Sequence, residues 1–330
     1  MKHVNVSLFV PHLGCPHRCV FCDQTAISGA GRPITKEEIV SACETAMRTP
    51  HDKENAEIAF FGGSFTAVDR SVQRMCLEAA APYLGTGFSG IRVSTRPDAV
   101  DDDTLCFLKR YGVTAIELGA QSMDNAVLAL NGRGHTAEDT VNAAKRVKAA
   151  GFSLGLQMMT GLPGSSDETD KATARRFVEL RPGTVRVYPT VVLKNTALAR
   201  MYEAGEYTPP TLEQSVNLCA ALLLTFHEAN IPVIRLGLHS GGNVDENYVA
   251  GPYHPAFREK CEAVIYKQKI SALLSDKPPG AYTLLVSPGH ASKTAGQKRS
   301  NLTFFEQQGF RLRIVETPGV GPFELRIIDQ

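Results

Sequence analysis

The sequence predicts an α/β fold, a partial (β/α)6 barrel of the TIM type followed by a small C-terminal α+β module. Strand-like and helix-like segments alternate six times between residues 4 and 229. The loops between them are short, as in right-handed crossovers between parallel strands. Glycine-rich and polar clusters follow the strands, and a parallel barrel has its active site at the carboxyl ends of its strands. A doubly wound open sheet would show the same periodicity, and six units instead of eight favour an open barrel.

The elements of the barrel region are predicted from apolar runs and from the residues that bound them. Two capping boxes, Thr35 with Glu38 and Ser165 with Glu168, mark helix starts, and Gly112 marks a helix end. Strands are expected at residues 4–10, 57–61, 91–94, 115–118, 152–159 and 184–188. Helices are expected at about residues 35–48, 69–83, 102–111, 136–150, 165–180 and 213–229.

We divide the chain into a barrel domain, residues 1–235, and a C-terminal module, residues 236–330. Six strand–helix units leave a lateral gap, and an exposed sheet edge is a liability that proteins cover. We therefore expect the module to extend or cap the barrel sheet. Its predicted elements are a helix at 255–274, a strand at 282–286, a helix at 292–308, and strands at 310–315 and 323–328.

Composition narrows the class of protein. Of the 330 residues, 43% are hydrophobic, which is enough for a buried core. The formal net charge of +1 does not indicate that the chain as a whole binds nucleic acid. No run of about 18 apolar residues predicts a membrane span. Eight cysteines without a signal peptide predict a reducing, cytoplasmic location and no membrane partner.

Charge is uneven along the chain. Residues 258–314 hold ten Lys/Arg and four Asp/Glu, a local net charge of +6. A basic face of this kind suits an RNA backbone, with Lys298 and Arg299 as candidate contacts. The alternative is a solvated surface on which these charges never form one patch.

Three cysteines, Cys15, Cys19 and Cys22, are spaced C-x3-C-x2-C within eight residues, and Phe21 precedes the last of them. Closely spaced thiolates favour an iron–sulfur, zinc or copper(I) centre. A [4Fe–4S] cluster held by three cysteines leaves one iron open to another ligand. The alternative is half of a zinc site, completed by His12 or His17. The remaining cysteines are scattered and are expected to be small buried hydrophobic residues: Cys43, Cys76, Cys106, Cys219 and Cys261.

This spacing, with an aromatic residue before the third cysteine, resembles the signature of the radical S-adenosylmethionine (SAM) superfamily. The resemblance implies a [4Fe–4S] cluster on Cys15, Cys19 and Cys22, with Phe21 near the adenine of SAM. It also implies that one electron from the cluster cleaves SAM to a 5′-deoxyadenosyl radical, which abstracts hydrogen from a substrate. The fold that it implies is a partial radical SAM barrel.

Motifs at the strand ends extend the resemblance. Gly62-Gly63-Ser64 resembles the family's glycine-rich contact to the SAM amino group, although the family often has Glu where this chain has Ser64. Four further segments, in their order and spacing, resemble the radical SAM region of the Elongator catalytic subunit, a tRNA-wobble-uridine enzyme: residues 95–98, 117–122, 131–135 and 157–164. The oxygen-independent coproporphyrinogen oxidases are a more distant likeness. By these likenesses four residues contact the SAM carboxylate or ribose: Glu117, Gln121, Arg133 and Gln157.

The function expected from the sequence is a radical SAM enzyme whose candidate substrate is tRNA. The resemblance implies a flavodoxin- or ferredoxin-like reductant. The Elongator subunit carries an acetyltransferase domain, and the residues that follow Arg235 here are too few for that fold. The alternative is a non-catalytic or haem/porphyrin-related relative that resembles the coproporphyrinogen oxidases.

Overall fold

The computed structural model describes residues 4–10, 19–22, 32–48, 56–238 and 243–329. Its largest element is an all-parallel sheet of seven strands in the order β1-β2-β3-β4-β5-β6-β8. These strands are β1 (Val4–Val10), β2 (Ala56–Gly62), β3 (Gly90–Thr95), β4 (Val113–Gln121), β5 (Ser153–Thr160), β6 (Thr184–Pro189) and β8 (Val233–Leu236).

The strand order confirms the partial barrel. Neighbours in this sheet follow chain order, whereas a doubly wound sheet reverses its strand order at a switch point. All six predicted strands are present. The seventh, β8, was not expected, because a four-residue strand gives little signal, and the predicted domain boundary at residue 235 falls inside it.

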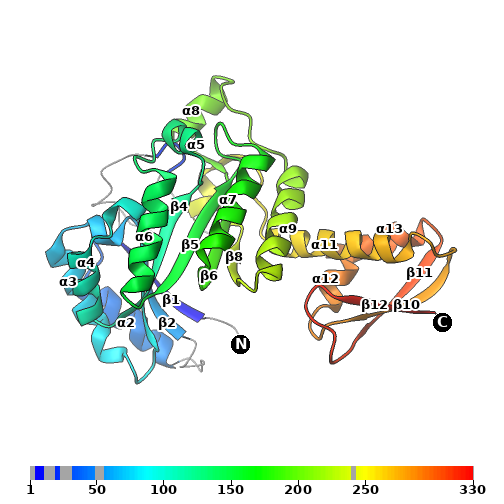
Figure 1. The fold of residues 1–330 in the computed structure, drawn as a ribbon, viewed down its shortest axis with the longest axis horizontal. Helices are drawn as coiled ribbons and strands as arrows, with labels where there is room; N and C mark the ends of the chain where they lie inside the picture. Colours follow the sequence, from blue (N-terminus) through cyan, green and yellow to red (C-terminus); the bar gives the residue numbers. More distant parts are fainter. Residues whose placement is uncertain (1–3, 11–18, 23–31, 49–55, 239–242, 330) are drawn as a thin grey trace.

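Helices follow the strands along one side of the sheet (Figure 1). Thr35 and Glu38 form the predicted capping box, with the Glu38 carboxylate 2.8 Å from the Thr35 amide nitrogen. The second capping box starts one residue later than predicted, at Ser166. Ser165 belongs to the preceding turn instead, because its amide donates to the Leu162 carbonyl. The helices of the barrel are α2 (Lys36–Arg48), α3 (Arg70–Ala80), α4 (Asp102–Arg110), α5 (Asn125–Leu130), α6 (Ala137–Ala149), α7 (Asp167–Leu180), α8 (Ala197–Glu203) and α9 (Leu212–Glu228).

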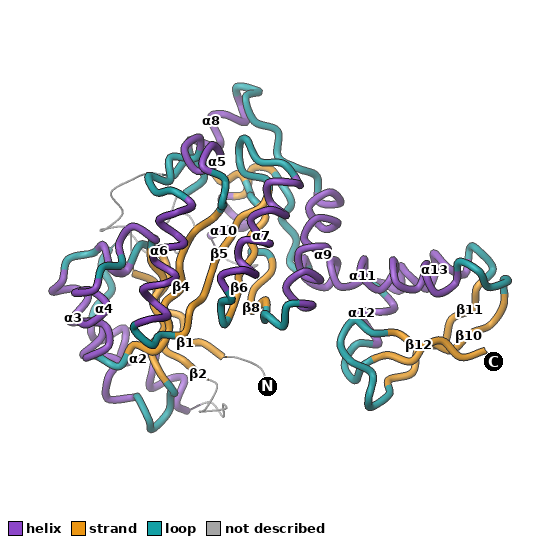
Figure 2. The backbone as a smooth tube through the Cα atoms, in the orientation of Figure 1, coloured by secondary structure: helices purple, strands orange, loops and turns teal. Residues whose placement is uncertain are grey.

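The main core lies between the sheet and these helices. Successive strand side chains point to opposite faces of a sheet. Ile58 and Phe60 of β2 and Ile91 and Val93 of β3 are fully buried in this core. The intervening positions lie on the other, concave face, where several side chains are charged. Figure 2 shows the loops and the short helices α5 and α8 gathered at one end of the sheet.

Residues 257–329 add no strand to the barrel sheet, so the expectation that the module extends this sheet is wrong. They form a separate three-stranded sheet in the order β11-β10-β12, where β10 is Gly280–Val286, β11 is Phe310–Glu316 and β12 is Leu325–Asp329. The long helix α11 (Phe257–Leu274) runs from the barrel to this sheet (Figure 1). Its first half packs in the barrel core and its second half packs on the small sheet.

The helix predicted over residues 292–308 is interrupted. It divides into α12 (Ala291–Ala295), a turn at Gln297–Arg299 and α13 (Ser300–Glu306). Gly296, Lys298 and Arg299 all have positive φ, which a continuous right-handed helix does not allow.

A small two-stranded sheet of β7 (Val192–Leu193) and β9 (Tyr248–Ala250), with the short helix α10 (Asn243–Asn247), was not predicted. Crossing a bilayer requires a length and apolarity that none of the helices in the described ranges has. Four of the scattered cysteines, Cys43, Cys76, Cys219 and Cys261, are buried as predicted. The prediction is wrong for Cys106, which is exposed on α4.

Candidate functional site

The second half of the cysteine loop lies at the carboxyl end of the barrel. The Val20 amide donates to the Asn131 carbonyl at 3.2 Å, and the Leu198 amide donates to the Val20 carbonyl at 2.8 Å. These bonds fix the loop between the turn after α5 and the start of α8. Cys19 is buried and Cys22 is half-buried. Cys15, with the alternative ligands His12 and His17, lies outside the described residues.

Phe21 lies between these two cysteines and packs on an apolar cluster beside α8. This cluster includes Val192, Leu198 and Tyr207. The Tyr207 hydroxyl also donates to the Gly161 carbonyl at 2.6 Å, which ties the cluster to the end of β5. The Phe21 ring is therefore held in place next to Cys22.

Arg133 connects the cysteine loop to the barrel. Its Nη1 donates to the Cys19 Sγ at 3.0 Å, and its Nη2 donates to the Gly119 carbonyl. Gly132 and Gly134 have φ of 63° and 69°, so the glycines on both sides allow the turn that brings this side chain inward. Arg133 is only 6% exposed, and its Nε has no hydrogen-bond partner among the described residues.

Gln121 and Gln157 meet beside Gly119. Gln121 ends β4 with φ of 67°, at a register shift against β5. The Gln157 Nε2 donates to the Gln121 Oε1 at 3.3 Å. A Cβ at residue 119 would lie 3.1 Å from the Gln121 Nε2 and 3.7 Å from the Arg133 Nη2, so glycine leaves room for both side chains. The structure thus brings three of the predicted SAM-contact residues to one place beside Cys19.

The glycine pair at the end of β2 has a steric reason. Gly62 has φ of 109°, and a Cβ there would lie 2.6 Å from the Val10 carbonyl oxygen. The next amide, that of Gly63, donates to the same oxygen at 3.0 Å. Ser64 is buried, and its hydroxyl lies 2.7 Å from the Thr95 hydroxyl. Ser64 therefore joins the ends of β2 and β3.

Arg96 and His135 both lie near Arg133. Arg96 pairs with Asp98 through two bonds of 2.9 Å and also donates to the Arg133 carbonyl. The His135 Nε2 lies 3.2 Å from the Ala120 carbonyl. Burial, together with the nearby Arg133 charge, lowers the pKa of His135 to about 4, so the imidazole is neutral near pH 7.

Charged side chains line the concave face below these strand ends. Arg92 of β3 donates to Glu57 of β2 at 2.7 Å, and Arg186 of β6 forms an ion pair with Glu117 of β4. Burial raises the pKa of Glu117, against the opposing effect of Arg186. Glu117 is only 1% exposed. Its carboxylate is engaged by a cation of the protein itself.

The sequence reasoning missed Glu57, Arg92 and Arg186. A signal was present, because Arg92 stands between Ile91 and Val93, and Arg186 stands between Val185 and Val187. A lone charge within an apolar strand indicates a polar position on the second face of the sheet, which is either exposed or paired with another charge.

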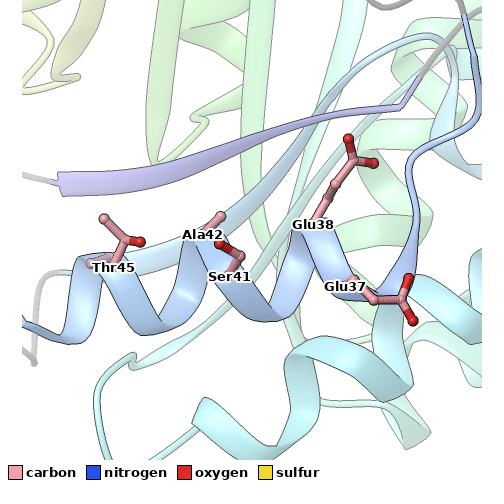
Figure 3. A pocket seen from close by; sticks show the side chains of 6 residues that line it. Glu37, Glu38, Ser41, Ala42 and Thr45 are labelled. Atoms are coloured by element: carbon pink, nitrogen blue, oxygen red, sulfur yellow. The ribbon is translucent and has the colours of Figure 1, made fainter.

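A surface hollow of about 620 Å³ runs along α2 (Figure 3). The residues that line it are Glu37, Glu38, Ser41, Ala42, Thr45 and Ala46. None of them belongs to the predicted site, and Glu38 is committed to capping its own helix. In the described part of the chain no three His, Cys, Asp or Glu side chains are grouped to hold a metal. Cys15, the third ligand predicted, is not in that part.

Comparison with protein families gives two adjoining matches. The family described as "Radical SAM superfamily" matches residues 9–177, which is about half of the chain. The family described as "Radical_SAM C-terminal domain" matches residues 182–267.

Comparison with curated proteins finds relatives that are longer than the matched region. A tRNA uridine(34) acetyltransferase of Methanocaldococcus jannaschii is 27% identical over 245 residues, which cover 62% of this chain and 45% of the relative. The chain thus spans about half the length of relatives of this kind. An uncharacterized protein of the same organism is 30% identical over 258 residues, which cover 73% of this chain and 76% of that protein.

Among solved structures, the Elp3 protein of Methanocaldococcus infernus with an N-terminal deletion matches with a TM-score of 0.63 and 22% identity. The match covers 81% of this chain and 64% of that one. It shows that the partial barrel described above is shared with that protein.

Proposed function

The chain belongs to the radical SAM superfamily, and from this premise we propose that it is an enzyme that cleaves SAM with a [4Fe–4S] cluster. One observation carries the proposal. Cys19, Arg133, Gln121 and Gln157 come from four different segments of the chain and meet at the carboxyl end of the barrel. In a parallel barrel this end is the active-site face.

The residues present fit the two cofactors. The Arg133 Nη1 donates to the Cys19 sulfur at 3.0 Å and holds it at the carboxyl end of the barrel, and cysteine sulfurs are the usual ligands of iron–sulfur clusters. We propose Cys15, Cys19 and Cys22 as the ligands. The buried Arg133 Nε without a described partner suits an incoming carboxylate. When bound, cluster and SAM together supply a hydrogen-abstracting radical.

This arrangement supports a proposal for the individual contacts to SAM. We propose that Arg133 binds the SAM carboxylate and that Gln121 and Gln157 bind its ribose, because amides can bond both hydroxyls of a diol. The backbone of Gly62-Gly63 contacts the amino group, and Phe21 lies against the adenine. Glu117 was expected to contact SAM as well; because its carboxylate is paired with Arg186, we propose instead that it supports the concave face beneath the ligand.

The substrate that we propose is tRNA. One of the two relatives from Methanocaldococcus jannaschii is named as a tRNA uridine(34) acetyltransferase. A low-potential flavodoxin- or ferredoxin-like protein is the proposed electron donor. The alternative of a porphyrin-related or non-catalytic protein has no observation in its favour among the described residues.

Iron content tests the proposal. Anaerobically reconstituted protein should hold about four iron and four sulfide per chain. Substituting alanine for Cys15, Cys19 or Cys22 should abolish the cluster. The matched control is Cys106→Ala, which removes an exposed cysteine on α4 and should leave the cluster intact. Reduced protein should then convert SAM to 5′-deoxyadenosine. Stoichiometric zinc with no iron uptake would contradict the proposal, and a cluster without SAM cleavage would favour a non-catalytic protein.

A further inference from the structure

The three-stranded sheet β11-β10-β12 has helices on one face only. Figure 1 shows α11 and α13 on one side of these strands, with no helix on the other. The helix-covered face contributes Tyr282, Leu284, Leu312, Ile314, Leu325 and Ile327 to a small apolar core. Alternate residues of the same strands must lie on the opposite face, which we call the open face.

Strand register identifies the residues of the open face. Arg311 pairs with Ala281 and Arg313 pairs with Thr283. On the other side of β10, Arg326 pairs with Leu285 and Ile328 pairs with Thr283. The three arginines are exposed, and Ile328 is 50% exposed. The open face therefore consists of Ala281, Thr283, Leu285, Arg311, Arg313, Val315, Arg326 and Ile328.

The charge of the open face has one sign. Its three charged side chains are all arginines, and its remaining positions hold no Asp or Glu. Neither Arg311 nor Arg313 forms an ion pair with a residue that the structure describes. Arg326 donates one bond, of 3.3 Å, to the Gly319 carbonyl. Strand geometry places Arg311 and Arg313 about 7 Å apart along β11. Arg326 is two strands away, about 10 Å across the sheet, and is level with Val315, the open-face residue that follows Arg313.

We propose that the open face binds the phosphate backbone of RNA, the tRNA of the proposed function on which this inference rests. Guanidinium groups bind phosphates in bidentate fashion, and a strand surface whose charged residues are all arginines attracts polyanions. The open face has no aromatic residue on which a base could stack, so it contacts the backbone and not the bases.

The module is joined to the barrel at two places. Phe257 and Cys261 of α11 are anchored in the barrel core, while Ile270 and Leu274 of the same helix pack on the small sheet. Phe323, just before β12, also packs in the barrel core, with its ring 5.1 Å from that of His227. The open face is therefore carried by the same folded unit as the candidate site.

The local charge of +6 is divided between two layers of the module. Lys298 and Arg299, the contacts expected from the sequence, lie in the turn between α12 and α13, in the helical layer. Lys267 stacks on the Phe304 ring at 3.5 Å, also in this layer. Removing cations from one layer or from the other should therefore affect RNA binding differently.

The test compares two pairs of exposed cations by fluorescence anisotropy with a labelled, unmodified tRNA transcript. Arg311→Gln/Arg313→Gln removes two charges from the open face, and Lys298→Gln/Arg299→Gln removes two from the helical layer. The open-face pair should weaken binding at least tenfold at 150 mM salt. The slope of the logarithm of the binding constant against the logarithm of the salt concentration should also become shallower by about 1.5, which is the contribution of two phosphate contacts. The helical-layer pair should change affinity less than twofold.

SAM cleavage without RNA should be the same in both variants and in the wild type. Equal loss of RNA affinity in the two pairs would overturn the inference, because it would show an effect of overall charge. Wild-type protein that cleaves SAM but binds tRNA without salt dependence would also overturn it. Salt-dependent binding only to vesicles containing phosphatidylserine would assign the face to lipid instead. Face-dependent tRNA binding without SAM cleavage would support the inference and overturn the proposed function.

Discussion

The buried ion pair of the concave face predicts a large cost for Glu117→Gln. The substitution keeps the shape of the side chain and removes the negative charge that faces Arg186. The Arg186 guanidinium would keep a 3.5 Å bond to the Tyr188 hydroxyl and its position 4.5 Å from the Phe61 ring. Neither contact neutralises it, and Glu57 is already paired with Arg92.

The expected loss of stability follows from how deeply the two side chains are buried. The Glu117 and Arg186 side chains are 2% and 10% exposed. Breaking a pair buried to this degree leaves an uncompensated charge and costs about 3–5 kcal/mol of unfolding free energy. The matched control is Glu179→Gln, whose pair with Arg176 is 60% and 50% exposed and contributes at most about 1 kcal/mol.

Urea unfolding followed by circular dichroism measures both variants. The double variant Glu117→Gln/Arg186→Gln should recover at least about 1 kcal/mol relative to Glu117→Gln, because it leaves no buried charge unpaired. A loss for Glu117→Gln as small as that for Glu179→Gln would refute the reasoning. It would mean that water reaches the concave face freely.

Two further predictions concern the strand ends. Arg133→Ala and Gln157→Ala should each weaken SAM binding to the reconstituted protein by about 1–3 kcal/mol, measured by equilibrium dialysis, with iron content unchanged; unchanged affinity in both variants would contradict the proposed contacts. Burial raises the pKa of Asp170 to about 7, so the native state holds a proton that the unfolded chain releases near pH 4. Stability should therefore fall between pH 5 and pH 7 by up to about 1.4 kcal/mol per pH unit. Asp170→Asn should flatten this slope in urea unfolding, and an unchanged slope would rule out Asp170 as its source.

Much of the barrel could be predicted because its signals are local. Apolar runs such as residues 58–61 mark strands, and caps such as Thr35 with Glu38 mark helix starts. The strand β8 and the pairing of β7 with β9 gave no such signal, since two to four residues carry no periodicity. The place of the small sheet also could not be predicted, because apolar alternation in β10 and β11 does not say which sheet a strand joins.

The candidate site was predictable where a residue type has few other uses at that spacing. Cys19 and Cys22 belong to a triplet with a known chemistry, and Arg133 stands between two glycines that turn it inward. The bond from Arg133 to the Cys19 sulfur was not predictable, since 114 residues separate the two and only the fold brings them together.

The ion pair on the concave face could not be predicted from the sequence, because it depends on the order of the strands. Glu117 of β4 and Arg186 of β6 are not on neighbouring strands, because β5 lies between them. The β5 residue opposite Glu117 is Gly155, and a Cβ there would lie 3.0 Å from the Glu117 Cγ. Glycine at this one position lets the two side chains meet across the intervening strand. A charge within an apolar strand is compatible with exposure or with a buried pair, and strand order and register together determine which one occurs.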